Sequence, residues 1–336
     1  MSQQQVFQIK ISIIVAGLVL SVVSSLVMAK PPKQVSSLDQ VPKQIQSKAG
    51  LEQYNEQMSG TAKPDGFGIL LPARLTAKEI VALIAPGEDA GLATLVGAKA
   101  WPYRPNSFVA IACFAKTKAV FDSGKEVSKE PTCKKDYDPS QNNGGQYVDQ
   151  AVYLGVLEYK ADAIKPALIA SYGKPLDIKT SWKSSKLEGP SQDVDEGEEI
   201  NVMPEEYRRF DFAPFKLTDT DTAIGLRFGW NEGYAGGTGY FEALALFKID
   251  GTRLINVLAE PIYYYQDLAG DWHKNGTRDH EVYEGQNVLS FLPNKTQGYY
   301  DLQIKTQGGK WKKVFQWDSK AARYSAVAST AKTKKH

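Results

Sequence analysis

The chain has 336 residues, of which 23% are charged and 42% are hydrophobic, and its formal net charge is +2. Acidic and basic residues are interspersed through most of its length, which excludes the clustered positive charge of a nucleic-acid-binding protein. This length suffices for one large β-rich domain or for two ordinary domains of about 100 to 200 residues each.

The first 29 residues have the pattern of a secretory signal peptide. A polar start with one cation, Lys10, precedes an apolar run over residues 11–23, and residues 26–29 end in Ala29 with short side chains at the cleavage positions. This pattern predicts cleavage after Ala29. The alternative is an uncleaved anchor, because residues 11–29 approach the roughly 20 that span a bilayer. We expect an exported protein, periplasmic or secreted, with no membrane attachment after cleavage.

Residues 30–63 are rich in Gln, Ser, Lys and Pro. They are interpreted as a flexible lead, with a short helix after Ser47 as the alternative, and order is expected to begin near Phe67. Thr76 and Glu79 then form a capping box, which predicts a helix that ends at Pro86.

Two short apolar runs, at residues 108–114 and 152–159, predict buried strands. Together with the helix they suggest a mixed α/β N-terminal domain over residues 64–187. Cys113 and Cys133 are the only cysteines. Export would place them where thiols oxidise, so they are expected to form a disulfide rather than two buried free thiols.

The acidic stretch at residues 188–200 is interpreted as a linker, and residues 326–336 as a solvated basic tail, because runs of like charge repel themselves. Between them, residues 223–230 predict a strand, and residues 241–249 alternate with one apolar face. Asp250-Gly251 and Gly308-Gly309 predict two hairpins. We therefore expect an α+β, mainly β fold whose residues 201–325 form an antiparallel β-sandwich or a barrel-like domain.

One segment partly matches a calcium-binding loop. Asp138, Ser140, Asn142 and Asp149 occupy four of its ligand positions, but Asn143 stands where the loop requires glycine. The segment is therefore interpreted as a turn, with these four residues as the metal candidates, and no metal or cofactor is expected.

The candidates for acid–base chemistry are His273, His280 and Asp279, which lie in a polar insert between two strands. Imidazoles among carboxylates can bind a metal or transfer protons. The spacing of the two histidines matches neither a helical nor a strand register, and Asn275-Gly276 predicts a tight turn. An exposed loop without catalytic function is therefore the preferred interpretation.

Aromatic residues in two expected loops are the candidate binding anchors. Residues 229–239 are glycine-rich and suggest a long hairpin connection, and residues 270–284 contain the polar insert. These loops include Trp230, Tyr234 and Trp272. Because tryptophan and tyrosine are favoured at binding hot spots, we expect these three residues to contact a partner.

The end of the chain carries a family resemblance. Residues 296–302 read T-Q-G-Y-Y-D-L and are followed by Trp317, Asp318 and Tyr324. This arrangement resembles the closing β-module of uncharacterised exported proteobacterial proteins, over about 30 residues. The resemblance implies a Gram-negative periplasmic location and a β fold, and it implies no catalytic residue.

Export and polar loops on a rigid β frame favour a non-enzymatic binding protein. Its expected partner is another protein or cell-wall material of the envelope. The specific hypothesis is an inhibitor or immunity protein against an envelope-targeting toxin. The alternatives are a cell-wall glycan-binding module and a periplasmic hydrolase that uses His273 and His280 with nearby carboxylates.

Overall fold

A computed structural model describes residues 31–61, 63–141, 145–160, 163–191 and 201–327, without the side chains of residues 201 and 202. From Pro32 onward these residues belong to one compact unit. The predicted signal peptide and most of the predicted basic tail lie outside the described residues. Within the described part, no helix is long and apolar enough to cross a membrane.

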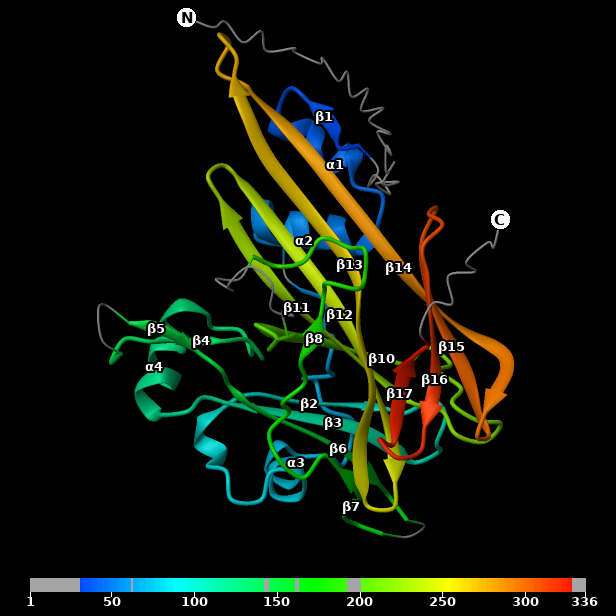
Figure 1. Cartoon of the computed structure of the whole chain (residues 1–336). Coiled ribbons are helices and arrows are strands. Elements are labelled where there is room, and N and C mark those ends of the chain that lie inside the picture. The colour runs from blue at the N-terminus through cyan, green and yellow to red at the C-terminus, as the bar shows by residue number, and fades with distance from the viewer. Residues whose placement is uncertain (1–30, 62, 142–144, 161–162, 192–200, 328–336) are drawn as a thin grey trace, which may run out of the picture. The chain divides into compact units, whose positions relative to one another are not determined.

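Short elements alternate in the first half of the chain, whereas long strands dominate the second (Figure 1). The elements up to residue 181 are β1 (Lys33–Val35), η1 (Leu38–Gln40), α1 (Val41–Gln44), α2 (Lys48–Ser59), α3 (Ala77–Ile84), η2 (Ala90–Leu92), β2 (Ala93–Ala100), β3 (Ser107–Phe114), α4 (Lys118–Val127), β4 (Asp136–Asp138), β5 (Gln146–Val148), β6 (Ala151–Glu158), β7 (Ala167–Ser171) and β8 (Thr180–Ser181). Those after residue 200 are β9 (Asn201–Val202), β10 (Glu206–Asp211), β11 (Ile224–Tyr234), β12 (Gly237–Asp250), β13 (Arg253–Trp272), β14 (Arg278–Thr296), β15 (Tyr299–Thr306), β16 (Lys312–Asp318) and β17 (Arg323–Ala326).

Thirteen of the described strands join in one large sheet. Its main path runs β17-β16-β15-β14-β13-β7-β6-β3-β2, and β1, β10, β11 and β12 pair beside this path. Pairing from β10 to β17 is antiparallel, as predicted, while β13 meets β7 in a parallel contact at Arg253 and Ser171. With 47% strand and 14% helix, the α+β, mainly β class is confirmed, and the sheet is open rather than closed into a barrel.

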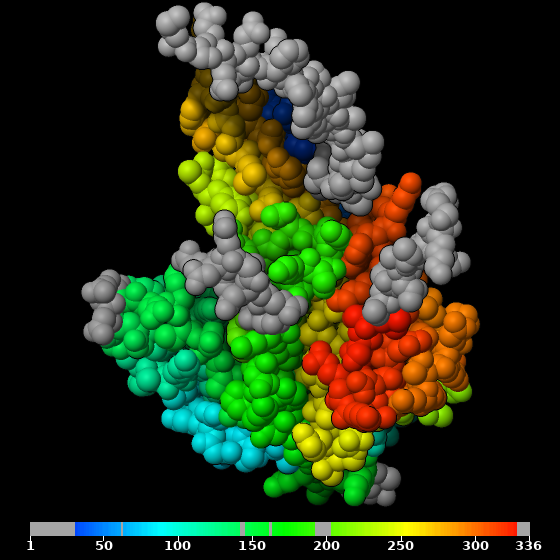
Figure 2. All heavy atoms as spheres, viewed as in Figure 1, coloured from blue at the N-terminus to red at the C-terminus, as the bar shows by residue number. Residues whose placement is uncertain are grey.

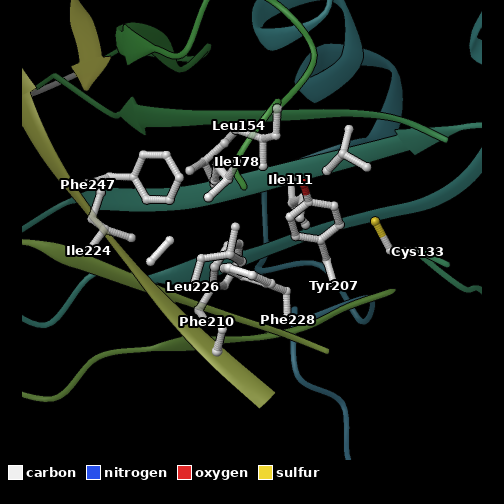
Figure 3. Packing of buried hydrophobic residues seen from close by; sticks show 14 of the residues in the cluster. Ile111, Cys133, Leu154, Ile178, Tyr207, Phe210, Ile224, Leu226, Phe228 and Phe247 are labelled. Carbon is white, nitrogen blue, oxygen red and sulfur yellow. The ribbon is translucent and has the colours of Figure 1, made fainter. Parts of the chain in front are cut away.

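The largest core lies between two parts of this sheet. Ile111 and Leu154, from β3 and β6, face Leu226, Phe228 and Phe247 from β11 and β12 (Figure 3). A second cluster covers the opposite face of β12, and helix α3 covers the outer face of β2, β3 and β6 with a third. Strand β12 is therefore buried on both faces, because alternate residues of a strand point to opposite sides.

The N-terminal segment is ordered from its first described residues, so the expectation that order begins near Phe67 is wrong. Strand β1 pairs with β14, and Val41 and Tyr54 are buried in the second cluster. The alternative helix after Ser47 is confirmed as α2, whose N-cap Ser47 accepts a hydrogen bond from the amide of Gly50. This segment packs onto the long β13–β14 hairpin, and its few apolar side chains make the contacts that stabilise it. The polar overall composition of residues 30–63 does not indicate these contacts.

Local turn signals agree well with the structure. The capping box of Thr76 and Glu79 starts α3. The hairpin predicted at Asp250-Gly251 joins β12 to β13. Within its two-residue loop, φ is positive at Gly251 alone, which fits a type II′ turn. The hairpin at Gly308 joins β15 to β16.

The predicted disulfide between Cys113 and Cys133 is confirmed, with 5.5 Å between the two Cα atoms. It ties the end of β3 to the segment before β4 and encloses helix α4, which the sequence pattern did not reveal. Crosslinking of this kind stabilises a fold by about 3 kcal/mol in the chain-entropy model.

The motif residues near the C-terminus contact one another. The ring of Tyr299 stacks on that of Trp317 at 3.9 Å, and Trp317 meets Tyr324 edge to face. Gln297 and Gly298 both have positive φ, so they form the type I′ turn between β14 and β15. The motif therefore has a structural role at the β17 edge of the sheet.

The predicted linker at residues 188–200 falls mostly on residues outside the description. Core residues from both sides of it, such as Leu154 and Phe228, share one cluster. The 64–187 and 201–325 segments therefore pack against each other through a common core.

Candidate functional site

The β13–β14 hairpin extends beyond its neighbouring strands. Strand β12 pairs with β13 only as far as Asp267, and β1 pairs with β14 only as far as His280. Within the described residues, the part from 268 to 279 is thus a two-stranded ribbon, which we call the hairpin tip (Figure 1). The tight turn predicted at Asn275-Gly276 is confirmed, since His273 donates its amide to the carbonyl of Thr277.

Trp272 is the exposed aromatic residue of the hairpin tip, with 69% of its surface accessible. The guanidinium of Arg278 lies 5.2 Å from the centre of its ring, in a cation–π contact. Arg278 also donates from Nε to the carbonyl of Gly270 at 2.7 Å and from Nη1 to the carbonyl of Ala235 at 3.3 Å. This cation holds the indole and links the tip to the neighbouring β11–β12 hairpin, whose end lies beside it on the surface (Figure 2).

Trp230 is fully buried, so the prediction that it lies on an exposed loop is wrong. Its indole Nε1 donates to the carbonyl of Met203 at 2.8 Å, and its ring meets Trp182 edge to face. The segment at 229–239 is no long loop, because β11 and β12 continue through it to a two-residue turn at Ala235-Gly236. Strand alternation then directs Trp230 into the core.

Tyr234 lies at the end of β11 and is partly buried. Its hydroxyl donates to Glu232 at 2.6 Å and accepts from the side-chain amide of Gln266 at 2.9 Å. Burial and then the hydrogen bond to Glu232 raise the pKa of Tyr234 to about 12. Its polar group is thus already engaged, which leaves Trp272 as the exposed anchor among the three candidates.

The two candidate histidines belong to separate pairs. His280 Nδ1 lies 2.8 Å from Asp267 Oδ1, and both side chains are buried. His273 Nε2 lies 2.8 Å from Asp279 Oδ1 in the exposed tip. A general base must reach its substrate, and the burial of His280 prevents this. The structure therefore does not assemble His273, His280 and Asp279 into one acid–base site.

The calcium-loop candidates are also dispersed. Asp138 accepts hydrogen bonds from Ser140 and Gln141, which lower the pKa of Asp138 and stabilise a turn. Asp149 pairs with Lys135 at 3.4 Å, and Asn142 lies outside the described residues. In the described part of the chain, no three His, Cys, Asp or Glu residues are grouped to hold a metal ion.

A pocket of about 610 Å³ was not predicted from the sequence. It lies between the first turn of α2, residues 63–66 and one face of strands β10 to β14. Its lining includes three carboxylates and six cations, and we call it the basic pocket after the latter: Lys48, Lys63, Lys99, Arg208, Arg209 and Arg227. One sequence feature could have indicated this pocket: the charged residues Arg227 and Glu242 lie within otherwise apolar strands.

Two close approaches shape the walls of the basic pocket. A Cβ at Gly50 would lie 2.2 Å from the hydroxyl of Tyr263, so α2 can rest on β13 only with glycine there. A Cβ at Gly66 would lie 2.1 Å from the carbonyl of Arg208, where Phe210 donates its amide to Gly66. Glycine at these two positions therefore allows α2 and the 63–66 segment to approach the sheet closely.

Behind the wall lies an ion cluster around the buried carboxylate of Glu206. Glu206 forms ion pairs with Arg208 and Lys63, and Lys63 also pairs with Glu56 at 2.8 Å. Burial alone would raise the pKa of Glu206, but the charges of Arg208 and Lys63 outweigh it and lower this pKa to about 2. The cluster joins the segment before residue 66 to β10, and it neutralises two of the six cations.

Comparisons with known proteins give no assignment. No family model matches the chain, and no curated protein or solved structure matches it either. The likeness of the last strands to exported proteobacterial proteins stays a prediction. What the tip and the pocket bind is therefore inferred from their own chemistry.

Proposed function

We propose that this chain is an exported binding protein that contacts another protein of the cell envelope through the hairpin tip. The observation that carries the proposal is Trp272, which is 69% exposed yet held in place by Arg278. Tryptophan and arginine are enriched at binding hot spots, and a restrained side chain loses little freedom on binding.

The surroundings of Trp272 support a protein partner. Residues 270–276 are all exposed, and the hairpin tip also carries the polar side chains of His273, Lys274 and Asp279. An apolar anchor within a polar rim is the usual anatomy of a protein interface. A projecting two-stranded ribbon also has only marginal stability by itself. An exposed tryptophan on such a ribbon favours a role in contacting a partner.

Export is supported by the disulfide, because such bonds persist in oxidising compartments. The specific case we propose is inhibition of an envelope-directed toxin. Inhibition requires only that a surface block the toxin, so a binding tip is sufficient.

The proposal is tested by identifying a partner and then measuring its affinity. Proteins captured from an envelope extract are identified, produced recombinantly and titrated with the wild type, Trp272→Ala and Tyr147→Ala. Tyr147 is the matched control, because it is also 69% exposed but lies in β5. We expect Trp272→Ala to weaken binding at least thirtyfold, as for a hot spot of about 2 kcal/mol, and Tyr147→Ala to leave it unchanged.

Equal affinities for the two variants would contradict the role of the tip. Binding of peptidoglycan fragments that depends on Trp272, without a protein partner, would favour the glycan alternative instead. For the toxin case, equimolar wild-type protein should suppress the partner's enzymatic activity, and Trp272→Ala should not.

A further inference from the structure

The basic pocket has the position and size of a ligand site. Its volume of about 610 Å³ falls within the 300 to 1,000 Å³ that is usual for small-molecule sites. Its floor is a cross-strand row in which Glu242 pairs with Tyr263 and Tyr263 pairs with Gln286. A floor on paired strands is rigid, so it presents its side chains in fixed positions.

The two arginines of the floor do not share their two carboxylate partners equally. Arg209 and Arg227 share one carboxylate: Glu242 Oε1 accepts from Arg209 Nη2 at 3.2 Å and from Arg227 Nη1 at 2.9 Å. Glu242 Oε2 accepts from the hydroxyl of Tyr240 at 2.8 Å, so both oxygens of this carboxylate have hydrogen-bond partners. Arg227 has a second carboxylate partner in Asp211.

Arg209 is the cation with binding capacity to spare. Among the described residues, its ion pair with Glu242 is the one it makes, and its side chain remains 35% exposed. A guanidinium has five N–H donors in a planar fork that fits a carboxylate or a phosphate. The unused donors of Arg209 therefore suit an anion that enters the pocket.

Lys99 adds a second cation. Its ammonium donates to the backbone carbonyl of Asp65 at 2.7 Å. The Asp65 carboxylate is occupied by the backbone amides of Phe67, Gly68 and Ile69. Lys99 thus has a neutral oxygen as its hydrogen-bond partner, while its charge also interacts with the nearby Asp65 carboxylate. Its ammonium lines the same pocket as Arg209.

We propose that the basic pocket binds a small hydroxylated anion, a sugar acid or a sugar phosphate, whose charged group pairs with Arg209 and Lys99. Gln286 and Glu52 line the same pocket and supply an amide and a carboxylate for ligand hydroxyl groups. The volume exceeds that of a simple inorganic anion, which favours a ligand of carbohydrate size. This site is separate from the hairpin tip and independent of the proposed protein contact.

The test is calorimetric titration of the full chain at low salt with glucuronate, glucose 6-phosphate, inorganic phosphate and glucose. We expect at least one of the first two to bind and glucose not to bind, and the two anions distinguish a carboxylate from a phosphate ligand. Arg209→Gln should weaken binding at least tenfold. Arg104→Gln is the matched control, because Arg104 is 38% exposed, has one carboxylate partner and lies outside the pocket.

Arg209→Gln should fold, since Glu242 keeps Arg227 and Tyr240 as partners. If it does not, Lys99→Gln tests the same site by removing a side chain that donates to a backbone carbonyl. Trp272→Ala should titrate like the wild type. The proposal is overturned if neither sugar anion binds, if glucose binds equally well, if inorganic phosphate binds as tightly as the sugar anions, or if the pocket variants bind like the wild type.

Discussion

The hairpin tip and the rest of strands β11 to β14, which we call the body, contain the same residue types in opposite environments. Trp230 in the body is fully buried, whereas Trp272 in the tip is 69% exposed. Each region also has one histidine–aspartate pair at 2.8 Å, and the exposed fractions are 5% and 3% in the body but 39% and 47% in the tip. The two pairs have the same length but should contribute differently to stability, because water screens the exposed pair and is excluded from the buried one.

The two tryptophans provide the largest test of this contrast. Trp230→Ala leaves a cavity in the core and should lower the free energy of unfolding by about 3 to 5 kcal/mol. Trp272→Ala should change it by less than about 0.5 kcal/mol, as for most surface positions. Urea denaturation of both variants measures this difference, and similar losses would contradict the division into body and tip.

The two pairs provide the second test. Asp267→Ala removes the hydrogen-bond partner of the buried His280, and leaving a buried polar group unsatisfied should cost about 1 to 3 kcal/mol. Asp279→Ala breaks an exposed pair of the same length, and such pairs are worth at most about 1 kcal/mol. The free energies of unfolding at neutral pH distinguish these cases. A loss in Asp279→Ala as large as that in Asp267→Ala would refute the role of burial.

The ion cluster around Glu206 adds a pH dependence. The pKa of Glu206 is lowered from 4.5 to about 2, so the unfolded state binds more protons between these values. Its stabilisation is present above about pH 4.5 and is lost as the pH falls toward 2. The difference between wild type and Glu206→Gln should grow by about 2 to 3 kcal/mol from pH 2 to pH 5. Glu52→Gln, at a partly buried position outside the ion cluster, is the control variant.

Asp267 should show a smaller dependence of the opposite sign. Burial raises its pKa, and the hydrogen bond with His280 opposes this only in part. The folded state therefore binds more protons than the unfolded state just above the ordinary pKa of an aspartate, so this contribution weakens as the pH rises there. Unfolding measured over that range should show the difference between wild type and Asp267→Asn shrinking with rising pH. A growing difference would contradict the assignment.

Features governed by neighbouring residues were predictable from the sequence. The capping box at Thr76, the hairpin at Gly308 and the disulfide of Cys113 all follow from local geometry or from a unique pairing. Each depends on a few residues whose conformational preferences persist in any environment. The α+β, mainly β class followed from the same signals summed along the chain.

The tertiary structure decided which side chains are buried and which are exposed to solvent and to partners. Trp230 and Trp272 are both tryptophans near a glycine-rich hairpin, yet only the packing of a second sheet layer over β11 buries one of them. The basic pocket likewise needs α2, which is distant in sequence, to approach strands β10 to β14. Periodicity shows that a strand has two faces, but the element that covers each face comes from elsewhere in the chain. Burial, and with it the strength of every charge and the exposure of every anchor, was therefore settled by long-range contacts.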